Sequence, residues 1–121
     1  ASVKDDLAIC QLDADGVTFT PIPLGSPATV GSPVAVISHP EKQFYMLTTG
    51  TVSRYARVSM GKRPVPCMQI TADYGIGSSG APVLNAGGNV VGAATGAGSR
   101  ILGVVKEIRE KLEKGETIAK V

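Results

Sequence analysis

Short runs of apolar and β-branched residues, separated by turn-forming residues, make up the hydrophobic pattern of this chain. The first run spans residues 6–13, where Leu7, Ile9 and Leu12 are apolar and the sequence "DADG" closes the run as a turn. Residues 20–33 contain four prolines and two glycines, a composition that disfavours helix. The start of the chain therefore predicts one strand followed by an extended connector.

The middle of the chain repeats the alternation of strands and turns. Residues 34–40 and 44–58 are two β-branched runs, and residues 67–72 predict a third strand after the turn "GKRPVP". Residues 81–95 predict a hairpin around a two-glycine turn, and residues 100–105 predict a last strand. About seven short strands without alternating helices favour a sandwich or small barrel over a parallel sheet.

The apolar period changes in the tail of the chain. Val104, Ile108 and Leu112 recur at helical spacing, and Gly115 follows as a stop signal. The sequence therefore predicts an amphipathic C-terminal helix at about residues 105–115.

Composition narrows the class of protein and its partners. With 121 residues and 43% hydrophobic residues the chain can form one domain, and its core is expected to be aliphatic because it has no Trp and two Phe. The net charge is +2 and Lys and Arg form no dense tract before the tail, so we expect no nucleic-acid partner. No apolar run approaches the ~20 residues that cross a bilayer, so we expect no membrane span.

The metal-binding residue types are too few to build a site. Cys10 and Cys67 form neither a C-x-x-C motif nor a disulfide framework; we interpret them as two buried thiols, and a single disulfide stays open. His39 is the only histidine. We therefore predict no metal site and no cofactor.

The glycine-rich sequence "DYGIGSSGAPVLN", residues 73–85, contains the spacing G-x-G-x-x-G. A dinucleotide site needs a helix directly after the third glycine and an acidic residue ~20 positions later. Here Pro82 and a predicted hairpin follow, and the acidic residue is missing. A phosphate-binding turn is thereby excluded, as is a P-loop, because no Gly-Lys-Ser/Thr follows.

The same turn can present a serine nucleophile. Gly77 and Gly80 flank Ser78 and Ser79 and can adopt positive φ, which lets backbone amides converge on a developing oxyanion. The small side chain of Ala81 leaves the far side open. On local composition alone, an ordinary Gly/Ser turn is the alternative.

The sequence "GSSGAP" with the hairpin behind it resembles the nucleophile turn of chymotrypsin-fold (trypsin-like) serine peptidases, in the style of the HtrA/Deg group. The resemblance covers nearly the whole chain in the right order. It implies an all-β fold: the second six-stranded antiparallel β-barrel of that family plus the last strand of the first barrel, with a C-terminal α-helix. Residues 1–14 would be that last strand, residues 15–30 the connector between barrels, and residues 31–121 the C-terminal barrel with its terminal helix.

Carried over by motif, the resemblance implies roles for individual residues. Ser79 would be the nucleophile, the amides of Gly77 and Ser79 the oxyanion hole, and Asp6 the carboxylate that orients a catalytic histidine, with Asp5 as the adjacent alternative. The family often has Asp or Asn where Ser78 stands, so this turn must be held in another way.

The base of the expected triad is missing from the sequence. The family's histidine precedes the aspartate by tens of residues, whereas five residues precede Asp6, and His39 falls in a different turn, where we expect a structural role. The chain starts without Met, which favours a fragment that lacks an N-terminal barrel segment and is inactive alone. The alternative is a catalytically dead relative that binds peptides by strand addition. The exposed edge of residues 6–12 also predicts a homo-oligomer formed by strand exchange.

The resemblance also suggests a substrate pocket and a location. Asp73 lies six residues before Ser79, at the floor of the side-chain pocket in trypsin-like members, where it would favour Lys or Arg in a polypeptide substrate. Alternatively, Asp73 caps a turn. The pocket walls match Thr95, Gly96, Ala97 and Gly103. The family resemblance favours a periplasmic or secreted protein.

Overall fold

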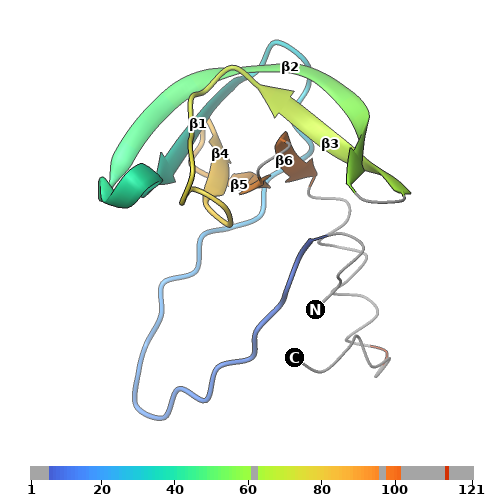
Figure 1. The fold of residues 1–121 in the computed structure, drawn as a ribbon. Coiled ribbons are helices and arrows are strands. Elements are labelled where there is room, and N and C mark those ends of the chain that lie inside the picture. The colour runs from blue at the N-terminus through green and yellow to red at the C-terminus, as the bar shows by residue number, and fades with distance from the viewer. Residues whose placement is uncertain (1–5, 61–62, 96–97, 102–113, 115–121) are drawn as a thin grey trace.

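The computed structural model describes residues 6–60, 63–95, 98–101 and 114 (Figure 1). A short 3₁₀ turn, η1 (Pro40–Lys42), joins the first two strands. The strands within the described ranges are β1 (Pro33–Ser38), β2 (Met46–Met60), β3 (Arg63–Ile70), β4 (Pro82–Asn85), β5 (Val90–Thr95) and β6 (Gly98–Ile101). The C-terminal helix predicted at 105–115 lies outside the described residues.

The strands close into a barrel in the order β1-β2-β3-β6-β5-β4. Every pairing is antiparallel, and the pairing of β1 with both β2 and β4 closes the barrel. Figure 1 shows the long strand β2 curving over one side of it. The prediction of an all-β, six-stranded antiparallel barrel is confirmed.

Alternating side chains of the strands fill the barrel. In β1, Val34, Val36 and Ser38 point inward and are buried, while their neighbours are exposed or half-buried. The buried cluster is aliphatic except for one methionine, and it consists of Val34, Val36, Val52, Met68, Ala72, Val83 and Val91. Burying each larger side chain contributes ~1.5–3 kcal/mol, so the core that the composition predicted is the main source of stability.

Strand β3 begins earlier than the sequence predicted. The stretch "GKRPVP" was expected to be a turn, yet pairing with β2 already starts at Arg63, opposite Met60. Pro64 and Pro66 are two residues apart, so their missing N–H groups face the same side of the strand and the remaining residues can still pair. The turn prediction was wrong there because it treated proline as a strand breaker at every position.

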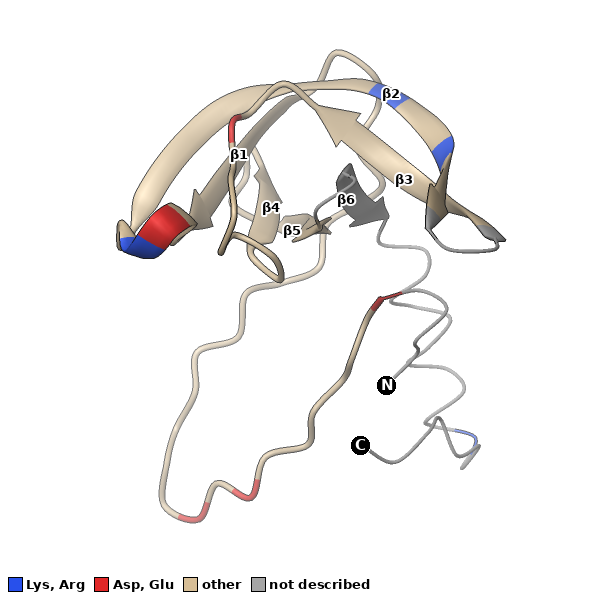
Figure 2. Cartoon of the chain, viewed as in Figure 1, with Lys and Arg blue, Asp and Glu red and all other residues tan. Residues whose placement is uncertain are grey.

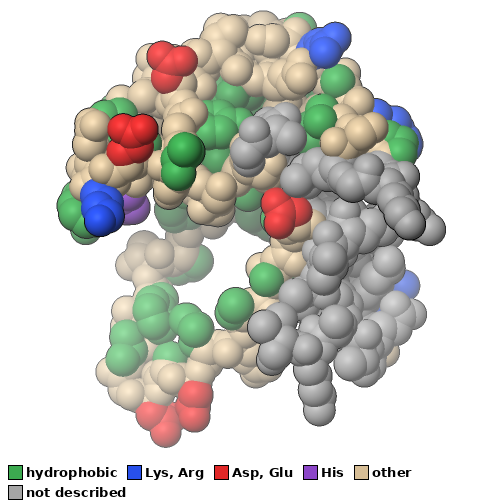
Figure 3. Space-filling model, viewed as in Figure 1, with side chains coloured by type: hydrophobic (Ala, Val, Ile, Leu, Met, Phe, Trp, Pro, Cys, Tyr) green, Lys and Arg blue, Asp and Glu red, His purple; other side chains and the backbone are tan. Residues whose placement is uncertain are grey.

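The strand predicted at residues 6–13 is not formed in the described part of the chain. Leu7 makes only an isolated bridge, and the connector is attached to the barrel later, where Leu24 bridges to Val90. A strand needs a paired neighbour, and residues 8–22 have none among the described residues. Figure 3 shows hydrophobic side chains along this segment below the barrel. Its exposed large hydrophobic residues are Ile9, Leu12, Val17, Phe19 and Ile22.

The two cysteines lie in different environments. Cys67 is buried in β3, whereas Cys10 is exposed on the N-terminal segment, and no disulfide joins them. The interpretation as two buried thiols is therefore right for Cys67 and wrong for Cys10, whose predicted strand lacks a covering neighbour. In the described ranges, no helix has the length and apolar character needed to cross a membrane.

Candidate active site

The segment that leads from β3 into the glycine-rich turn is fastened across β2. The amide of Thr51 donates to Thr71 Oγ1 at 2.9 Å, and the amide of Thr71 donates to the Thr51 carbonyl at 3.0 Å. The hydroxyl of Thr48 donates to the Asp73 carbonyl at 2.6 Å. Gly50 makes this crossing possible, because a Cβ there would lie 2.2 Å from the Ala72 nitrogen.

The glycine-rich turn itself is closed by backbone hydrogen bonds. The amide of Ser78 donates to the Gly75 carbonyl at 3.0 Å, and the amide of Gly80 donates to the Ala94 carbonyl of β5 at 2.9 Å. Gly77 has φ 96° and Gly80 has φ 87°, the left-handed conformation that the sequence predicted for these glycines. The turn is thus anchored to the barrel on the side of β4 and β5.

The other side of the turn rests on the end of β1 and on η1. The amide of Glu41 donates to the Ile76 carbonyl at 2.8 Å. A Cβ on Gly77 would lie 3.0 Å from the His39 carbonyl oxygen, a tight approach, and the positive φ of Gly77 favours glycine in any case. The turn therefore has little freedom to shift away from β1.

A hollow of about 340 Å³ opens beside the turn and brings together some of the predicted site residues. It is lined by Tyr74, Gly75, Ile76, Gly77, Ser79 and Thr95. Ser79 is exposed to it, while its neighbour Ser78 is buried. The amides of Gly77 and Ser79 donate to no group among the described residues, although the amide of Ser78 between them is paired. Gly77 and Ser79 thus line the same hollow, and their two amides have no acceptor within the described ranges.

Such an arrangement can stabilise a tetrahedral oxyanion. Two amides that spend no hydrogen bond on the protein are available to an oxygen atom whose negative charge develops during a reaction. Among the described residues, no charged side chain lines the hollow. Figure 2 shows the acidic and basic residues scattered over the described chain rather than gathered at one place. In the described ranges, no group of three His, Cys, Asp or Glu residues could hold a metal ion.

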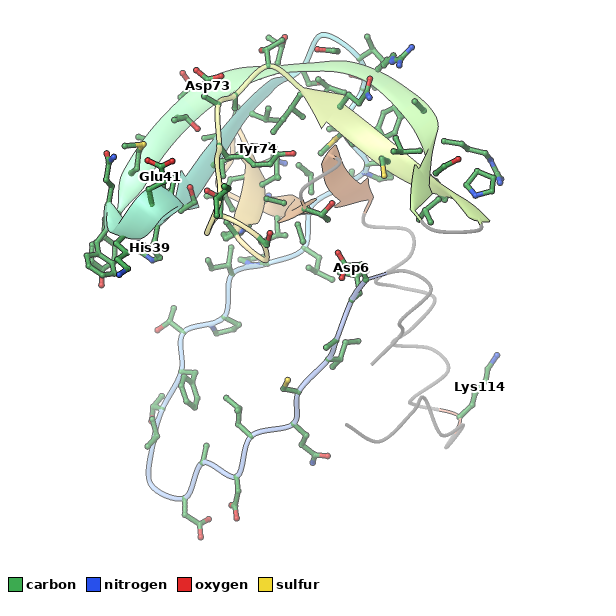
Figure 4. The ribbon with its side chains drawn as sticks, in the orientation of Figure 1. Asp6, His39, Glu41, Asp73, Tyr74 and Lys114 are labelled. Atoms are coloured by element: carbon green, nitrogen blue, oxygen red, sulfur yellow. The ribbon has the colours of Figure 1, made fainter. Side chains whose placement is uncertain are left out.

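The predicted pocket residues are only partly assembled. Thr95 is buried and lines the hollow, whereas Asp73 is exposed and is not among the lining residues. Figure 4 shows Asp73 on the outer side of the barrel, and Tyr74 packs partly against the core. Gly96, Ala97 and Gly103 lie outside the described residues.

The candidate triad partners do not meet. Asp6 is exposed and does not line the hollow, and Figure 4 places it far from His39. His39 accepts a hydrogen bond at Nδ1 from the Tyr45 amide at 2.8 Å, and its ring contacts the rings of Phe44 and Tyr45 at 5.5 and 5.0 Å. These contacts give His39 a structural role in the turn between β1 and β2.

Three residues of the site escaped the sequence reasoning. Tyr74 and Ile76 line the hollow, and their position inside the glycine-rich segment was a signal that could have identified them. Ser38 hydrogen-bonds to the turn from β1, forty residues before Ser78, and no local motif marks it.

Comparison with known proteins supplies a family for this geometry. The family of the trypsin-like peptidase domain matches residues 1–92. A probable periplasmic DegP-like serine endoprotease of Hahella chejuensis is 34% identical over 89 residues, which cover 74% of this chain and 19% of the relative. The chloroplastic protease Do-like 1 of Arabidopsis thaliana is 32% identical over 96 residues, 74% of this chain and 22% of the relative. The chain thus spans about a fifth of the length of these relatives.

Solved structures show the same fold. The inactive form of a serine-to-alanine mutant of Rv3671c from M. tuberculosis superimposes with a TM-score of 0.68 at 21% identity, covering 82% of this chain and 56% of that one. The crystal structure of Deg5 gives a TM-score of 0.64 at 25% identity, covering 77% and 48%. The barrel, the family match and the DegP and Do relatives agree: this chain belongs to the trypsin-like peptidase family, with a chymotrypsin-type fold similar to that of the HtrA/Deg proteases.

Proposed function

We propose that this chain carries the nucleophile and the oxyanion hole of a serine endopeptidase. Ser79 Oγ attacks the carbonyl carbon of a peptide bond in a polypeptide substrate, and the amides of Gly77 and Ser79 hold the oxygen that becomes negative. The observation that supports this most directly is the presence of an exposed serine and two amides without protein acceptors at one hollow. Collapse of the intermediate breaks the C–N bond, and water later releases the acyl group from Ser79.

The general base comes, in this proposal, from a polypeptide segment outside this sequence. A serine hydroxyl must lose its proton to attack, and the histidine of this chain is committed to the turn beside Tyr45. Asp6 would orient the incoming imidazole once the missing barrel segment has brought it to Ser79. The chain alone would therefore hydrolyse peptides slowly or not at all.

Labelling by a fluorophosphonate tests the nucleophile. The Ser79 oxygen displaces fluoride from phosphorus, and the base takes the proton. We expect labelling only when the N-terminal barrel segment is supplied in trans, loss of labelling in Ser79→Ala, and normal labelling in Ser53→Ala, a control that removes another exposed serine hydroxyl. Strong labelling of this chain alone would contradict the proposal that the general base comes from another segment. Labelling that survives Ser79→Ala would contradict the assignment of Ser79 as the nucleophile.

A binding module is the second candidate function. The lack of a base at the hollow, among the described residues, favours it, because such a barrel can still take up an extended peptide by adding it to a sheet edge. Peptide binding by the assembled protein without any labelling of Ser79 would select this function over catalysis.

The proposed substrate preference rests on Asp73. Its carboxylate would pair with a Lys or Arg side chain. Because Asp73 does not line the hollow, this pairing requires residues 73–76 to rearrange around the substrate. We expect the assembled enzyme to cleave after Arg faster than after Val, and Asp73→Asn to remove the difference. Faster cleavage after Val in the unaltered enzyme would contradict a basic preference.

We also propose a periplasmic or secreted location. Two DegP-like relatives carry the word periplasmic in their names, and the family resemblance points the same way. Fractionation of cells that express the natural gene would test this, with recovery in the cytoplasm as the contrary result.

A further inference from the structure

Two buried hydroxyl groups connect the glycine-rich turn to the barrel. Ser78 is 1% exposed and Ser38, the last residue of β1, is 3% exposed. The Ser78 hydroxyl donates to Ser38 Oγ at 3.0 Å, and the Gly75 amide donates to Ser78 Oγ at 3.3 Å. A buried hydroxyl without a partner costs free energy, so each of these serines restricts the orientation of the other.

The pair belongs to a continuous support for the turn. Ser38 ends β1 and bonds to Ser78, the His39 carbonyl lies next to Gly77, and Glu41 in η1 donates to the Ile76 carbonyl. Of these contacts, the one between the serines is the only contact made by two side chains. The hydrogen bond between Ser38 and Ser78 therefore requires a suitable side chain at both positions. The other contacts of the turn with this segment involve backbone atoms, so they tolerate most substitutions.

Anchoring Ser78 fixes the direction of both its neighbours. Ser78 is buried in the barrel and Ser79 is exposed at the hollow, because two successive tight turns, closed by the bonds Ser78 N–Gly75 O and Ala81 N–Ser78 O, place the neighbours in different environments. Rotation of Ser78 out of the barrel would turn the peptide groups on either side of it. The directions of the Gly77 and Ser79 amides at the hollow would then change.

We propose that Ser38 is a positioning residue for the oxyanion hole, acting through its hydrogen bond to Ser78. This proposal rests on the proposed function of Ser79 and explains how a turn with serine before the nucleophile is held. Ser38 contacts neither substrate nor the reacting atoms. Its hydroxyl instead holds Ser78, and through Ser78 the neighbouring peptide groups of Gly77 and Ser79, in the conformation that lines the hollow.

Amide hydrogen exchange on this chain tests the anchor without any catalysis. In Ser38→Ala we expect the amides of Ser78 and Glu41 to exchange about tenfold faster, because the loss of one buried hydrogen bond changes an opening equilibrium by that factor. The Asn85 amide, bonded within the β4–β5 turn, should exchange at its normal rate. Unchanged exchange at Ser78, or equal acceleration at Asn85, would overturn the anchor.

A second hydroxyl pair provides the matched control. Thr29 Oγ1 and Ser32 Oγ lie 2.8 Å apart, exposed, at the opposite end of β1. Ser32→Ala removes the same atom from the same kind of bond, and it should leave exchange in the glycine-rich turn unchanged. Acceleration at Ser78 in this variant would contradict a specific role of Ser38.

The double variant Ser38→Ala with Ser78→Ala separates positioning from stability. It removes both hydroxyls, and the exposed Gly75 amide, which loses its acceptor, can bond to water instead, so the free energy of unfolding should recover most of the loss caused by Ser38→Ala. Exchange at residues 78 and 41 should nevertheless stay fast, and in the assembled peptidase kcat should fall about tenfold or more with KM little changed. If the exchange rates and kcat of the double variant returned to those of the unaltered protein together with its stability, Ser38 and Ser78 would have only a structural role. If the assembled protein labels no serine at all, the proposed function fails, while the exchange result still decides the anchor.

Discussion

Ser78 and Ser79 are adjacent in sequence, yet one is buried in the barrel and the other is exposed at the hollow. Their chemistry is identical, so the difference comes from the turn that Gly77 and Gly80 allow and from the partner that Ser38 offers to Ser78. At the scale of single residues, Ser79 differs from Ser78 because Ser78 is hydrogen-bonded to Ser38 inside the barrel, which leaves Ser79 as the candidate nucleophile.

Tyr55 gives the connector a fixed point on β2. Its hydroxyl donates to the Ala28 carbonyl, and burial raises the pKa of this phenol above its ordinary value of about 10. The folded state therefore favours the neutral phenol. The contribution of the neutral Tyr55 hydroxyl to the free energy of unfolding is therefore complete below pH ~10, and it is lost as the pH rises through the raised pKa.

We expect Tyr55→Phe to reduce stability at neutral pH by about 1 kcal/mol and to flatten the loss of stability above pH ~10. Urea unfolding at several pH values measures both effects. Tyr45→Phe, which removes the hydroxyl of a largely exposed ring, is the matched control and should leave stability at neutral pH unchanged. A difference between Tyr55→Phe and the unaltered chain that is constant from pH ~8 to ~11 would contradict the assignment.

At the scale of elements, strand β2 supports the approach to the site. Residues 71–73 cross it close to Gly50 and are held there by Thr48 and Thr51. The hydroxyl and amide groups of this crossing fix where the glycine-rich turn begins. A change in β2, far from Ser79 in sequence, should therefore disturb the turn.

Gly50→Ala tests this dependence. The new Cβ would lie 2.2 Å from the Ala72 nitrogen, so the crossing segment must move, and we expect a loss of about 1–3 kcal/mol in the free energy of unfolding. Gly87→Ala, where the closest atom would be 3.4 Å from the new Cβ, should cost far less. Urea denaturation compares the two variants. Equal stability of both would show that the backbone crossing is looser than the structure indicates.

The elements differ in how well the sequence predicted them. The hairpin β4–β5 was predicted from Gly87 and Gly88, and its turn is closed by Asn85, whose side chain accepts from the amides of Gly87 and Asn89. That turn chemistry is local, so the sequence sufficed. The strand expected at residues 6–13 failed because pairing depends on a neighbour rather than on propensity.

At the scale of the molecule, the N-terminal segment leaves apolar side chains uncovered. Leu12 is 67% and Phe19 is 60% exposed, and the backbone around them is extended (Figures 1 and 3). An extended apolar segment with unpaired backbone groups can pair with a second copy of the same segment. Strand exchange between two copies therefore stays our prediction for this chain in isolation.

Sedimentation at increasing protein concentration measures this association. We expect the chain to dimerise, and the double variant Leu12→Asp with Phe19→Asp to be monomeric, because charges oppose burial of the segment. The matched control is the double variant Leu47→Asp with Phe44→Asp, which makes the same changes at exposed positions of β2 and of the turn before it. This variant should still dimerise. A monomer at all concentrations in the unaltered chain would contradict the prediction.

The sequence by itself predicted most of the barrel strands, the aliphatic core and the positive φ of Gly77 and Gly80, because alternation and turn chemistry act between residues that are near in the chain. The tertiary structure alone decided which serine faces the hollow, that Ser38 hydrogen-bonds to the buried Ser78, and that Asp73 and Asp6 are not among the lining residues of the hollow. These features depend on how β1, β2 and the turn are placed in the closed barrel. Contacts between residues forty positions apart leave no periodic signal in the sequence, so only the folded chain could reveal them.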